Sequence, residues 1–409
     1  MCVFLSSQIF IRSTDGKISA AIVSSSAGNT FSVFVYMKRF ISVLMACMAI
    51  CAICDAQHRA DRQNLTDPAS STLILLGDPQ GYVKYDLNTP LLDLVMYWIA
   101  DNAEHLNIKA ALCTGDLVEQ NDNNALNRNM LNRTSRQMWE AVSRSFSIID
   151  GKVPHLHSPG NHDYGFLHAE DEHTFYPDYF TAERQGRILL DRLVAEYPNR
   201  EGRASLENAA YEFDFDGWNR KILVITAEFA PSDGAVEWAK QLCLSDKYKD
   251  HHVIYMTHSY MKCHKCKNEV TSTEKYGLTQ RQGNNSGVQL WEKLFSQVPN
   301  IRFVICGHHG HGQEMTPEGK KDRYDWNVGW RVDRNAAGRN VYQMMFNVQT
   351  LGGGWEGNGG DGWLRILEFM PDGKTIKVRT YSPLFGISPL TRHLAHRTDD
   401  FDQFDFVIE

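Results

Sequence analysis

The sequence predicts an α/β fold in a single domain, with a core sheet that is mainly parallel. Two observations lead to this prediction. From residue 72 onward, apolar runs of strand length alternate with amphipathic segments of helix length, as in strand–helix–strand units. Five of the apolar runs also end in a loop that carries a carboxylate, an amide or an imidazole. In an open sheet, a functional site is expected beyond such strand ends.

The first elements follow from the hydrophobic pattern and from capping residues. Residues 72–76 are a continuous apolar run, which indicates a buried strand. Thr89 and Pro90 predict the start of a helix, because threonine is a good N-cap and proline fits the first helical turn. A strand at 108–113 and a helix at about 135–149 continue the alternation.

The later elements are expected from the same patterns. Residues 153–157 form the next expected strand, and a helix is predicted over 182–196. Strands at 211–215 and 221–226 are expected to pair across the turn Asp216-Gly217. The remaining expected elements are helices at 235–244 and 288–297 and strands at 252–257, 301–306, 341–348, 363–369 and 375–382.

The N-terminal region has the pattern of a signal peptide. Met-Lys-Arg at 37–39 begins a basic region, residues 40–53 are apolar, and residues 54–56 offer a small-residue cleavage site. We therefore expect a signal peptide at 37–56 and an exported protein, periplasmic or extracellular. The apolar stretch is too short to span a bilayer comfortably, so no membrane span is expected. Lipoprotein attachment through a cysteine is less favoured, because the residues before Cys47, Cys51 and Cys54 fit a lipid-attachment box poorly.

The remaining segment boundaries and the composition limit the class of protein. Residues 1–36 are interpreted as a mis-called upstream extension, 57–70 as a flexible lead-in, and 71–409 as the single domain. A hydrophobic content of 43% and a charged content of 22% are ordinary for a globular protein. The net charge of −7 argues against nucleic acid as a bulk partner. The sequence does not indicate an oligomeric state.

The cysteines do not form a disulfide framework. Cleavage after residue 56 leaves an odd number, namely Cys113, Cys243, Cys263, Cys266 and Cys306. The pair in Cys263-His264-Lys265-Cys266 has three interpretations: a local disulfide, half of a zinc site, or no function. Because no second cysteine pair has zinc-site spacing, a disulfide or no function is favoured over zinc.

The five polar loops carry the chemistry. They are Leu-Gly-Asp-Pro-Gln at 76–80, Cys-Thr-Gly-Asp at 113–116, Ser-Pro-Gly-Asn-His-Asp at 158–163, Met-Thr-His at 256–258 and Ile-Cys-Gly-His-His-Gly-His at 305–311. A mixed set of carboxylate, amide and imidazole ligands suits Mn, Fe or Zn. Two such cations ~3.5–4 Å apart can activate a water and hold a phosphoryl oxygen. A carboxylate such as Asp116 is suited to bridge two cations, because it has two oxygens.

These loops resemble the ordered motifs of the calcineurin-like metallophosphoesterases. That pattern is Asp-x-His, Gly-Asp, Gly-Asn-His-Asp/Glu, a lone His after an apolar strand, and Gly-His-x-His, and the resemblance covers about residues 72–382. Residues 359–365 and 381–383 look like the tail of exported bacterial members. The resemblance implies a four-layer α/β/β/α sandwich with two mixed β-sheets. It also implies hydrolysis of a small phosphate mono- or diester by a metal-bridging hydroxide.

The resemblance also implies roles for individual residues. The ligands implied for the first cation are Asp78, Gln80, Asp116 and a late histidine. The ligands implied for the second cation are Asp116, Asn161, His258 and His308. His162 would contact the phosphate and protonate the leaving oxygen, with Asp163 orienting its ring. His155 and His157 alternate on a strand and are interpreted as packed residues rather than ligands.

The sequence departs from the family pattern at two positions. Gln80 replaces the histidine of the first motif. In the last motif Gly310 stands where the second histidine belongs, so that either His308 with His311, after a shift of one residue, or His309 with His311 forms the pair. We favour His308 with His311. Both departures weaken the binding of the first cation, which predicts one tightly bound and one labile ion.

Two other functions remain open. If the first cation binds too weakly, the chain would be a binding protein that keeps the fold but has lost catalytic competence. A dinuclear metallohydrolase acting on a substrate other than a phosphate ester would use a similar site. The motifs do not distinguish among monoesters, diesters and nucleotides.

Overall fold

The computed structural model describes residues 10–14, 17–21, 39–45, 48, 62–125, 131–272, 276–278, 282–311, 314–316, 319–321 and 323–409. The chain divides into two compact units, Met1–Ala60 and Asp61–Glu409. In the first unit, β1 (Phe10–Thr14) and β2 (Lys17–Ala21) pair antiparallel, and residues 39–45 and 48 are helical. Most of the predicted signal peptide at 37–56 lies outside the described residues. None of the helices described is long and apolar enough to cross a membrane.

Two seven-stranded sheets form the centre of the second unit. In spatial order, the first sheet consists of β17 (His396–Arg397), β16 (Thr375–Tyr381), β15 (Leu364–Phe369), β3 (Ser71–Leu76), β4 (Ile108–Cys113) and β5 (His155–His157), with β18 (Phe404–Val407) beside β16. β3, β4 and β5 are parallel to their neighbours within this set, and the other pairs are antiparallel. The polar loops after β3, β4 and β5 therefore leave the same edge of the sheet.

The second sheet contributes the other two polar loops. Its strands in order are β13 (Val328–Arg334), β14 (Asn340–Phe346), β10 (Ile301–Cys306), β9 (His252–Met256), β8 (Ile222–Thr226), β7 (Asn208–Phe213) and β6 (Leu193–Tyr197). The four central strands, from β14 to β8, are parallel, and the outer pairs are antiparallel. Both sheets are mixed, as expected. A separate hairpin pairs β11 (Glu314–Thr316) with β12 (Gly319–Lys321).

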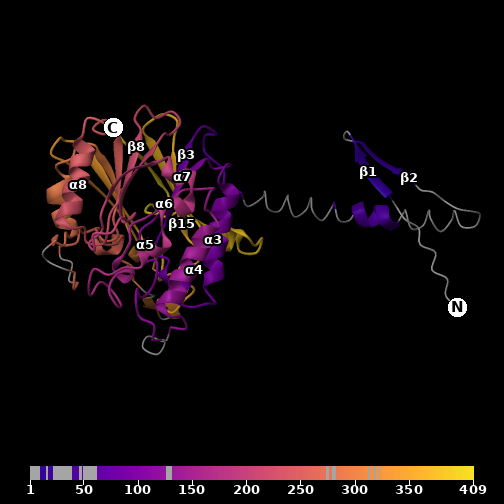
Figure 1. Ribbon diagram of the computed structural model, residues 1–409, viewed down its shortest axis with the longest axis horizontal. Helices are drawn as coiled ribbons and strands as arrows, with labels where there is room; N and C mark the ends of the chain where they lie inside the picture. Colours follow the sequence, from indigo (N-terminus) through magenta and orange to yellow (C-terminus); the bar gives the residue numbers. More distant parts are fainter. Residues whose placement is uncertain are drawn as a thin grey trace, which may run out of the picture. The chain divides into compact units, whose positions relative to one another are not determined.

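Helices cover the outer face of each sheet, which completes four layers (Figure 1). α3 (Thr89–Asn102) and α4 (Ser135–Ser147) lie on the first sheet, and α8 (Asp233–Leu244) and α9 (Gly287–Leu290) lie on the second. A capping box between Thr134 and Gln137 begins α4. The shorter helical segments are α2 (Gln80–Val83), η1 (Asn161–Asp163), α5 (Tyr176–Tyr179), α6 (Ala182–Gln185), α7 (Arg187–Leu190), η2 (His264–Cys266), η4 (Trp291–Phe295), η5 (Tyr324–Trp326), α10 (Pro383–Gly386) and η6 (Arg392–Leu394).

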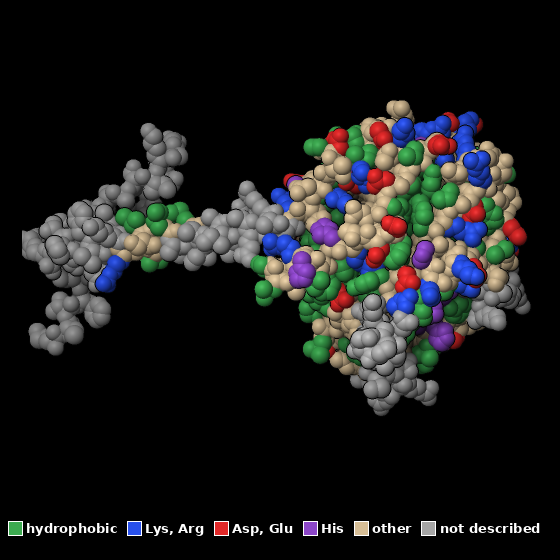
Figure 2. Space-filling view, turned by 180° about the vertical axis from the view of Figure 1, so that it is seen from behind, with side chains coloured by type: hydrophobic (Ala, Val, Ile, Leu, Met, Phe, Trp, Pro, Cys, Tyr) green, Lys and Arg blue, Asp and Glu red, His purple; other side chains and the backbone are tan. Residues whose placement is uncertain are grey.

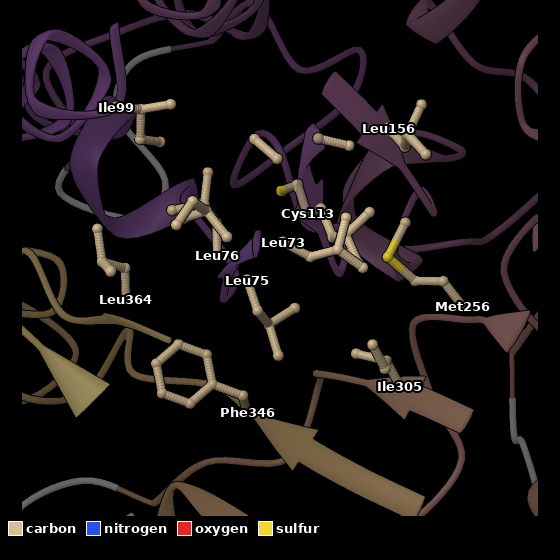
Figure 3. Packing of buried hydrophobic residues seen from close by; sticks show 14 of the residues in the cluster. Leu73, Leu75, Leu76, Ile99, Cys113, Leu156, Met256, Ile305, Phe346 and Leu364 are labelled. Atoms are coloured by element: carbon tan, nitrogen blue, oxygen red, sulfur yellow. The ribbon is translucent and has the colours of Figure 1, made fainter. Parts of the chain in front are cut away.

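The main hydrophobic core lies between the two sheets. Figure 3 shows Leu73 and Leu75 of β3 in one cluster with Met256 of β9, Ile305 of β10 and Phe346 of β14. All five side chains are fully buried. This packing holds the two sheets face to face and so brings their polar loops together. On the face seen in Figure 2, Lys and Arg side chains are interspersed with Asp and Glu, without a large patch of one sign.

One predicted helix is wrong. Instead of a helix over 182–196, the structure has α6, α7 and then the strand β6. Gly186 lies between the two short helices at a φ of 73°, a left-handed conformation that ends α6. β6 pairs antiparallel with β7, so sheet pairing overrides the local helical pattern. The edge strand β13 was not predicted. Five of its seven residues, 330–334, are exposed or partly exposed.

A chain of buried polar groups runs along β5. His155 Nε2 lies 2.8 Å from Asp150 Oδ1, and His155 Nδ1 lies 3.1 Å from His157 Nε2. His157 Nδ1 in turn lies 3.3 Å from the Tyr176 hydroxyl. Burial lowers the pKa of both His155 and His157 below the ordinary histidine value. Both side chains are packed in the folded protein, as their alternation predicted.

These two histidines are expected to make the protein less stable in acid. The unfolded chain binds their protons at about pH 6.5, whereas the folded chain does so only at lower pH. The free energy of unfolding should therefore fall as the pH drops below about 6.5, by at most ~1.4 kcal/mol per pH unit for each histidine. Urea unfolding between pH 5 and 8 checks this, and His157→Gln should reduce the dependence. Equal pH dependence in the wild type and the variant would contradict the assignment.

Candidate metal centre

Side chains from four strand ends meet at the Nε2 atom of His258. This atom lies 3.2 Å from Asp116 Oδ2, 3.2 Å from Asn161 Oδ1 and 3.1 Å from His308 Nδ1. The ligand atoms of Asp116, His258 and His308 all lie within 4.8 Å of one another. The structure thus brings together the four residues that the resemblance implies for the second cation.

Close packing of the backbone makes this convergence possible. His258 follows β9, and its Nδ1 lies 2.8 Å from the carbonyl oxygen of Thr114, so that Nδ1 donates and Nε2 is left to face the cluster. Asp116 has a φ of 47°. A Cβ at Gly115 would lie 2.2 Å from the Ser158 carbonyl oxygen, and a Cβ at Gly160 would lie 2.2 Å from Asp116 Oδ1. Both positions therefore require glycine.

Asp78 lies beside this cluster at the end of β3. Its Oδ1 accepts a hydrogen bond from the Thr114 hydroxyl at 3.0 Å, and its Oδ2 accepts one from the His308 backbone N–H at 3.0 Å. The loops after β3, β4 and β10 are thereby joined. The carboxylate is fully buried, and burial raises the pKa of Asp78 to about 7.

Gln80 is the third residue implied for the first cation, and its side chain is partly unsatisfied. The backbone N–H donates to the Asp116 carbonyl oxygen at 2.9 Å, and Nε2 donates to Glu119 Oε2 at 3.1 Å. Its Oε1 is buried and has no hydrogen-bond partner in the described part of the chain. An unpaired buried carbonyl oxygen is costly, and a cation would satisfy it. The donor set of Asp78, Gln80 and Asp116 therefore fits a metal ion.

The last histidine implied for the first cation is not at this cluster. His311 is exposed, and its Nε2 lies 3.9 Å from the Sγ of Cys266. Its ring packs edge-on against Trp326, with the ring centroids 4.8 Å apart. His309 packs against the ring of His308, and its Nε2 is buried without a partner among the described residues.

A residue that the motifs did not identify lies next to Asp78. Gln349 is buried, and its Nε2 lies 3.5 Å from Asp78 Oδ2. It follows β14 in the same way that the five polar loops follow their strands, so the same strand-end signal was available in the sequence. Nearby, Asn347 Nδ2 donates to the His308 carbonyl oxygen at 3.0 Å and supports the loop after β10.

The charges in the cluster depend strongly on one another. Burial alone would lower the pKa of His258, but the carboxylates of Asp116 and Asp78 outweigh burial and raise this pKa to about 10. Burial alone would raise the pKa of Asp116, but His258 and His162 hold it below the ordinary value. The buried carboxylates thus attract positive charge to the centre, which a divalent cation would supply.

His162 is held by its backbone and by one ring nitrogen. Its N–H donates to Asp116 Oδ1 at 3.0 Å, and its Nδ1 lies 2.6 Å from the Glu119 carbonyl oxygen. The other ring nitrogen, Nε2, is left for a ligand. Asp163 instead accepts backbone hydrogen bonds from Gly160 at 2.8 Å and Val118 at 3.1 Å, and so joins the two loops.

A relative of this chain is found among known proteins. No protein-family model matches the chain. The uncharacterized protein YvnB of Bacillus subtilis (strain 168) is 26% identical over 320 residues, which cover 76% of this chain and 20% of that protein. The chain thus spans about a fifth of the length of this curated relative.

The chain is similar to three solved structures at low sequence identity and with TM-scores below 0.5. A purple acid phosphatase from yellow lupin is 12% identical, with a TM-score of 0.40 and coverage of 85% of this chain and 55% of that one. A dimetal phosphatase from Danio rerio is 10% identical, with a TM-score of 0.42 and coverage of 84% and 100%. The NAD nucleotidase of Haemophilus influenzae is 11% identical, with a TM-score of 0.36 and coverage of 77% and 48%. The five motifs of this chain resemble the calcineurin-like metallophosphoesterases.

Proposed function

We propose that the chain is a metal-dependent phosphoesterase of the calcineurin-like family. The observation that carries this proposal is the meeting of Asp116, Asn161 and His308 at His258 Nε2, all within 3.1–3.2 Å. These donors come from separate loops of two sheets, and each loop is held by further buried hydrogen bonds. Such a preorganised set of oxygen and nitrogen donors is what a cation of the Mn, Fe or Zn type requires.

The residues divide into two ligand sets that share Asp116. Asn161, His258 and His308 would hold one cation with it, and Asp78 and Gln80 would hold the other. When bound, the two cations supply positive charge that polarises the phosphoryl oxygens and lowers the pKa of a nearby water. Gln80 supplies a neutral amide where the family motif has a histidine, and His311 lies at Cys266 instead, so we propose that this second set binds its cation more weakly.

His162 is the proposed acid for the leaving group. Its Nδ1 donates to the Glu119 carbonyl oxygen, so only the doubly protonated ring has a proton on Nε2 to transfer. Burial alone would lower the pKa of His162, but Asp116 and Glu119 raise it and favour this form. The hydrogen bond of its N–H to Asp116 places the ring beside the ligand cluster. A proton from Nε2 can then pass to the ester oxygen as the bond to phosphorus breaks.

Metal analysis and a substrate screen on the full-length chain test this function. The chain should bind one cation tightly and a second one weakly, and it should hydrolyse an aryl phosphate mono- or diester in a metal-dependent way. Turnover should disappear after chelation and return when Mn, Fe or Zn is added. Metal-loaded protein that hydrolyses no phosphate ester would indicate a binding protein. Turnover restricted to non-phosphate esters would indicate a different metallohydrolase.

His162→Ala is expected to lower kcat by roughly 10²–10⁴-fold, the range usual for loss of a general acid. The metal content should stay unchanged, because neither implied ligand set contains His162. Steady-state kinetics and metal analysis on the same preparation measure both quantities. His168→Ala is a matched control, since its ring lies 5.9 Å from that of His162, and it should have a smaller effect. An unchanged kcat in His162→Ala would contradict the assigned role.

A further inference from the structure

A second cluster of metal-binding side chains lies apart from the residues of the centre. It consists of Cys263, Cys266 and His311, whose ligand atoms all lie within 4.8 Å of one another. The two Sγ atoms are 2.9 Å apart, and Cys266 Sγ lies 3.9 Å from His311 Nε2. Both cysteines are free thiols. The interpretation of the pair as a disulfide is therefore not what the structure shows.

The fold of a short turn places the two thiols side by side. Cys263 precedes η2, and its carbonyl oxygen accepts hydrogen bonds from the N–H groups of Cys266 and Asn268, each at 3.0 Å. Lys267 and Asn268 have φ values of 61° and 54°, which reverse the chain directly after the second cysteine. A hydrogen bond of 2.8 Å from the Lys262 N–H to the Glu269 carbonyl oxygen closes the turn. The backbone of this turn thus brings the two cysteines close together.

The third member comes from a distant part of the chain. The carbonyl oxygen of His311 accepts a hydrogen bond from the Thr350 hydroxyl and lies 3.5 Å from Asn327 Nδ2. The packing of its ring on Trp326 directs Nε2 toward Cys266. Two independent segments of the chain therefore converge at this cluster. The contact between Cys266 Sγ and His311 Nε2, at 3.9 Å, is too weak a hydrogen bond to account for the convergence.

We propose that Cys263, Cys266 and His311 form a second metal site, which takes a borderline-soft divalent cation of the zinc type. Two sulfurs and one imidazole nitrogen are a donor set that favours zinc over the hard cations Mg²⁺ and Ca²⁺. On binding, each thiol releases its proton to water, so that two thiolates balance the two positive charges of the ion. His311 is exposed, which leaves the fourth coordination position open to a water molecule.

This site gives a role to the histidine that is out of register with the family motif. His311 follows His308 by three residues, and His308 belongs to the other cluster. A cation on Cys263 and Cys266 would anchor the end of the loop that presents His308. The proposal of this second site does not rest on the proposed phosphoesterase activity. Metal binding at the site is measured separately from turnover.

Zinc-edge X-ray absorption on the reduced, zinc-loaded full-length chain tests the second site. Sulfur scatterers at ~2.3 Å are expected, because the other centre has only oxygen and nitrogen donors. The double variant Cys263→Ser/Cys266→Ser should lose the sulfur signal and one equivalent of zinc. His311→Ala changes an exposed side chain and should release this zinc faster to a chelator. Asp116→Asn should keep the sulfur-bound zinc even if activity is lost.

His264→Ala is the matched control for His311→Ala. His264 lies in the same turn as the cysteines, but its ring packs against Phe401. This variant should keep the sulfur-bound zinc. Absence of sulfur scatterers in the reduced wild type, or a sulfur signal that survives the double serine variant, would overturn the proposal. A disulfide between Cys263 and Cys266 that persists under the same reducing conditions would overturn it as well.

Discussion

Asp116→Asn is expected to lower kcat/KM for a phosphate ester by ~10³-fold or more. Loss of cation stabilisation in the transition state costs several kcal/mol, and each 1.36 kcal/mol is about a factor of ten in rate. Asp116 is shared by the two proposed ligand sets, and its Oδ2 lies 3.2 Å from His258 Nε2. An amide keeps the shape of the side chain but not its negative charge, so both cations should bind more weakly.

The asparagine variant also separates chemistry from folding. Asp116 Oδ1 accepts the His162 N–H at 3.0 Å, and an amide oxygen can still accept this hydrogen bond. The loop should therefore keep its conformation, which a thermal melt can check. Kinetics with added metal measure the effect, and Asp246→Asn on the surface is the control, with a side chain 98% exposed. Turnover close to the wild-type value in Asp116→Asn would refute the assigned metal centre.

Asp402→Asn is expected to destabilise the fold by about 3–5 kcal/mol. Its buried carboxylate serves two arginines: Oδ1 lies 3.3 Å from Arg365 Nη2, and Oδ2 accepts from Arg397 Nε at 2.9 Å. The side chains of Arg365 and Asp402 are fully buried. Asp402 is the carboxylate that faces both arginines, so its neutralisation leaves their charges without compensation, which costs more than the net contribution of the pair.

Denaturant unfolding of Asp402→Asn and of Asp246→Asn measures this effect against a surface pair. Asp246 pairs with Lys249 at 2.7 Å, but both side chains are largely exposed, so its loss should cost less than about 1 kcal/mol. A similarly small loss in Asp402→Asn would show that Arg365 and Arg397 find other partners. The two variants together therefore test the importance of burial for these ion pairs.

Much of the fold follows from local patterns. The strands β4 and β10 have the predicted bounds, because each is a mainly apolar, mainly buried run between polar turns. The hairpin of β7 and β8 also follows from its turn, in which Gly217 has a φ of 76°. The segment 182–196 fails because its last residues pair with β7, and this pairing is absent from any local window of the sequence.

The candidate site likewise has residues that the sequence predicted and residues that it did not. The polar strand ends together with the family resemblance indicated Asp78, Asp116, Asn161, His258 and His308, and the structure brings these five together. The local spacing did not predict the position of His311, because the distance to Cys266 depends on how the loop after β10 crosses the turn at 263–266. Gln349 also stands just after a predicted strand, but its proximity to Asp78 depends on the packing of one sheet on the other and not on local spacing.

The sequence by itself determined which residues end the buried strands and carry ligand atoms, since hydrophobic period and turn residues act over a few positions. Only the tertiary structure decided which of these side chains share a centre. Pairing between distant strands, and the packing of the two sheets, set the distances among them. For this reason His258 meets Asp116 across 142 positions of the chain, whereas His311 lies next to cysteines that its own motif does not contain.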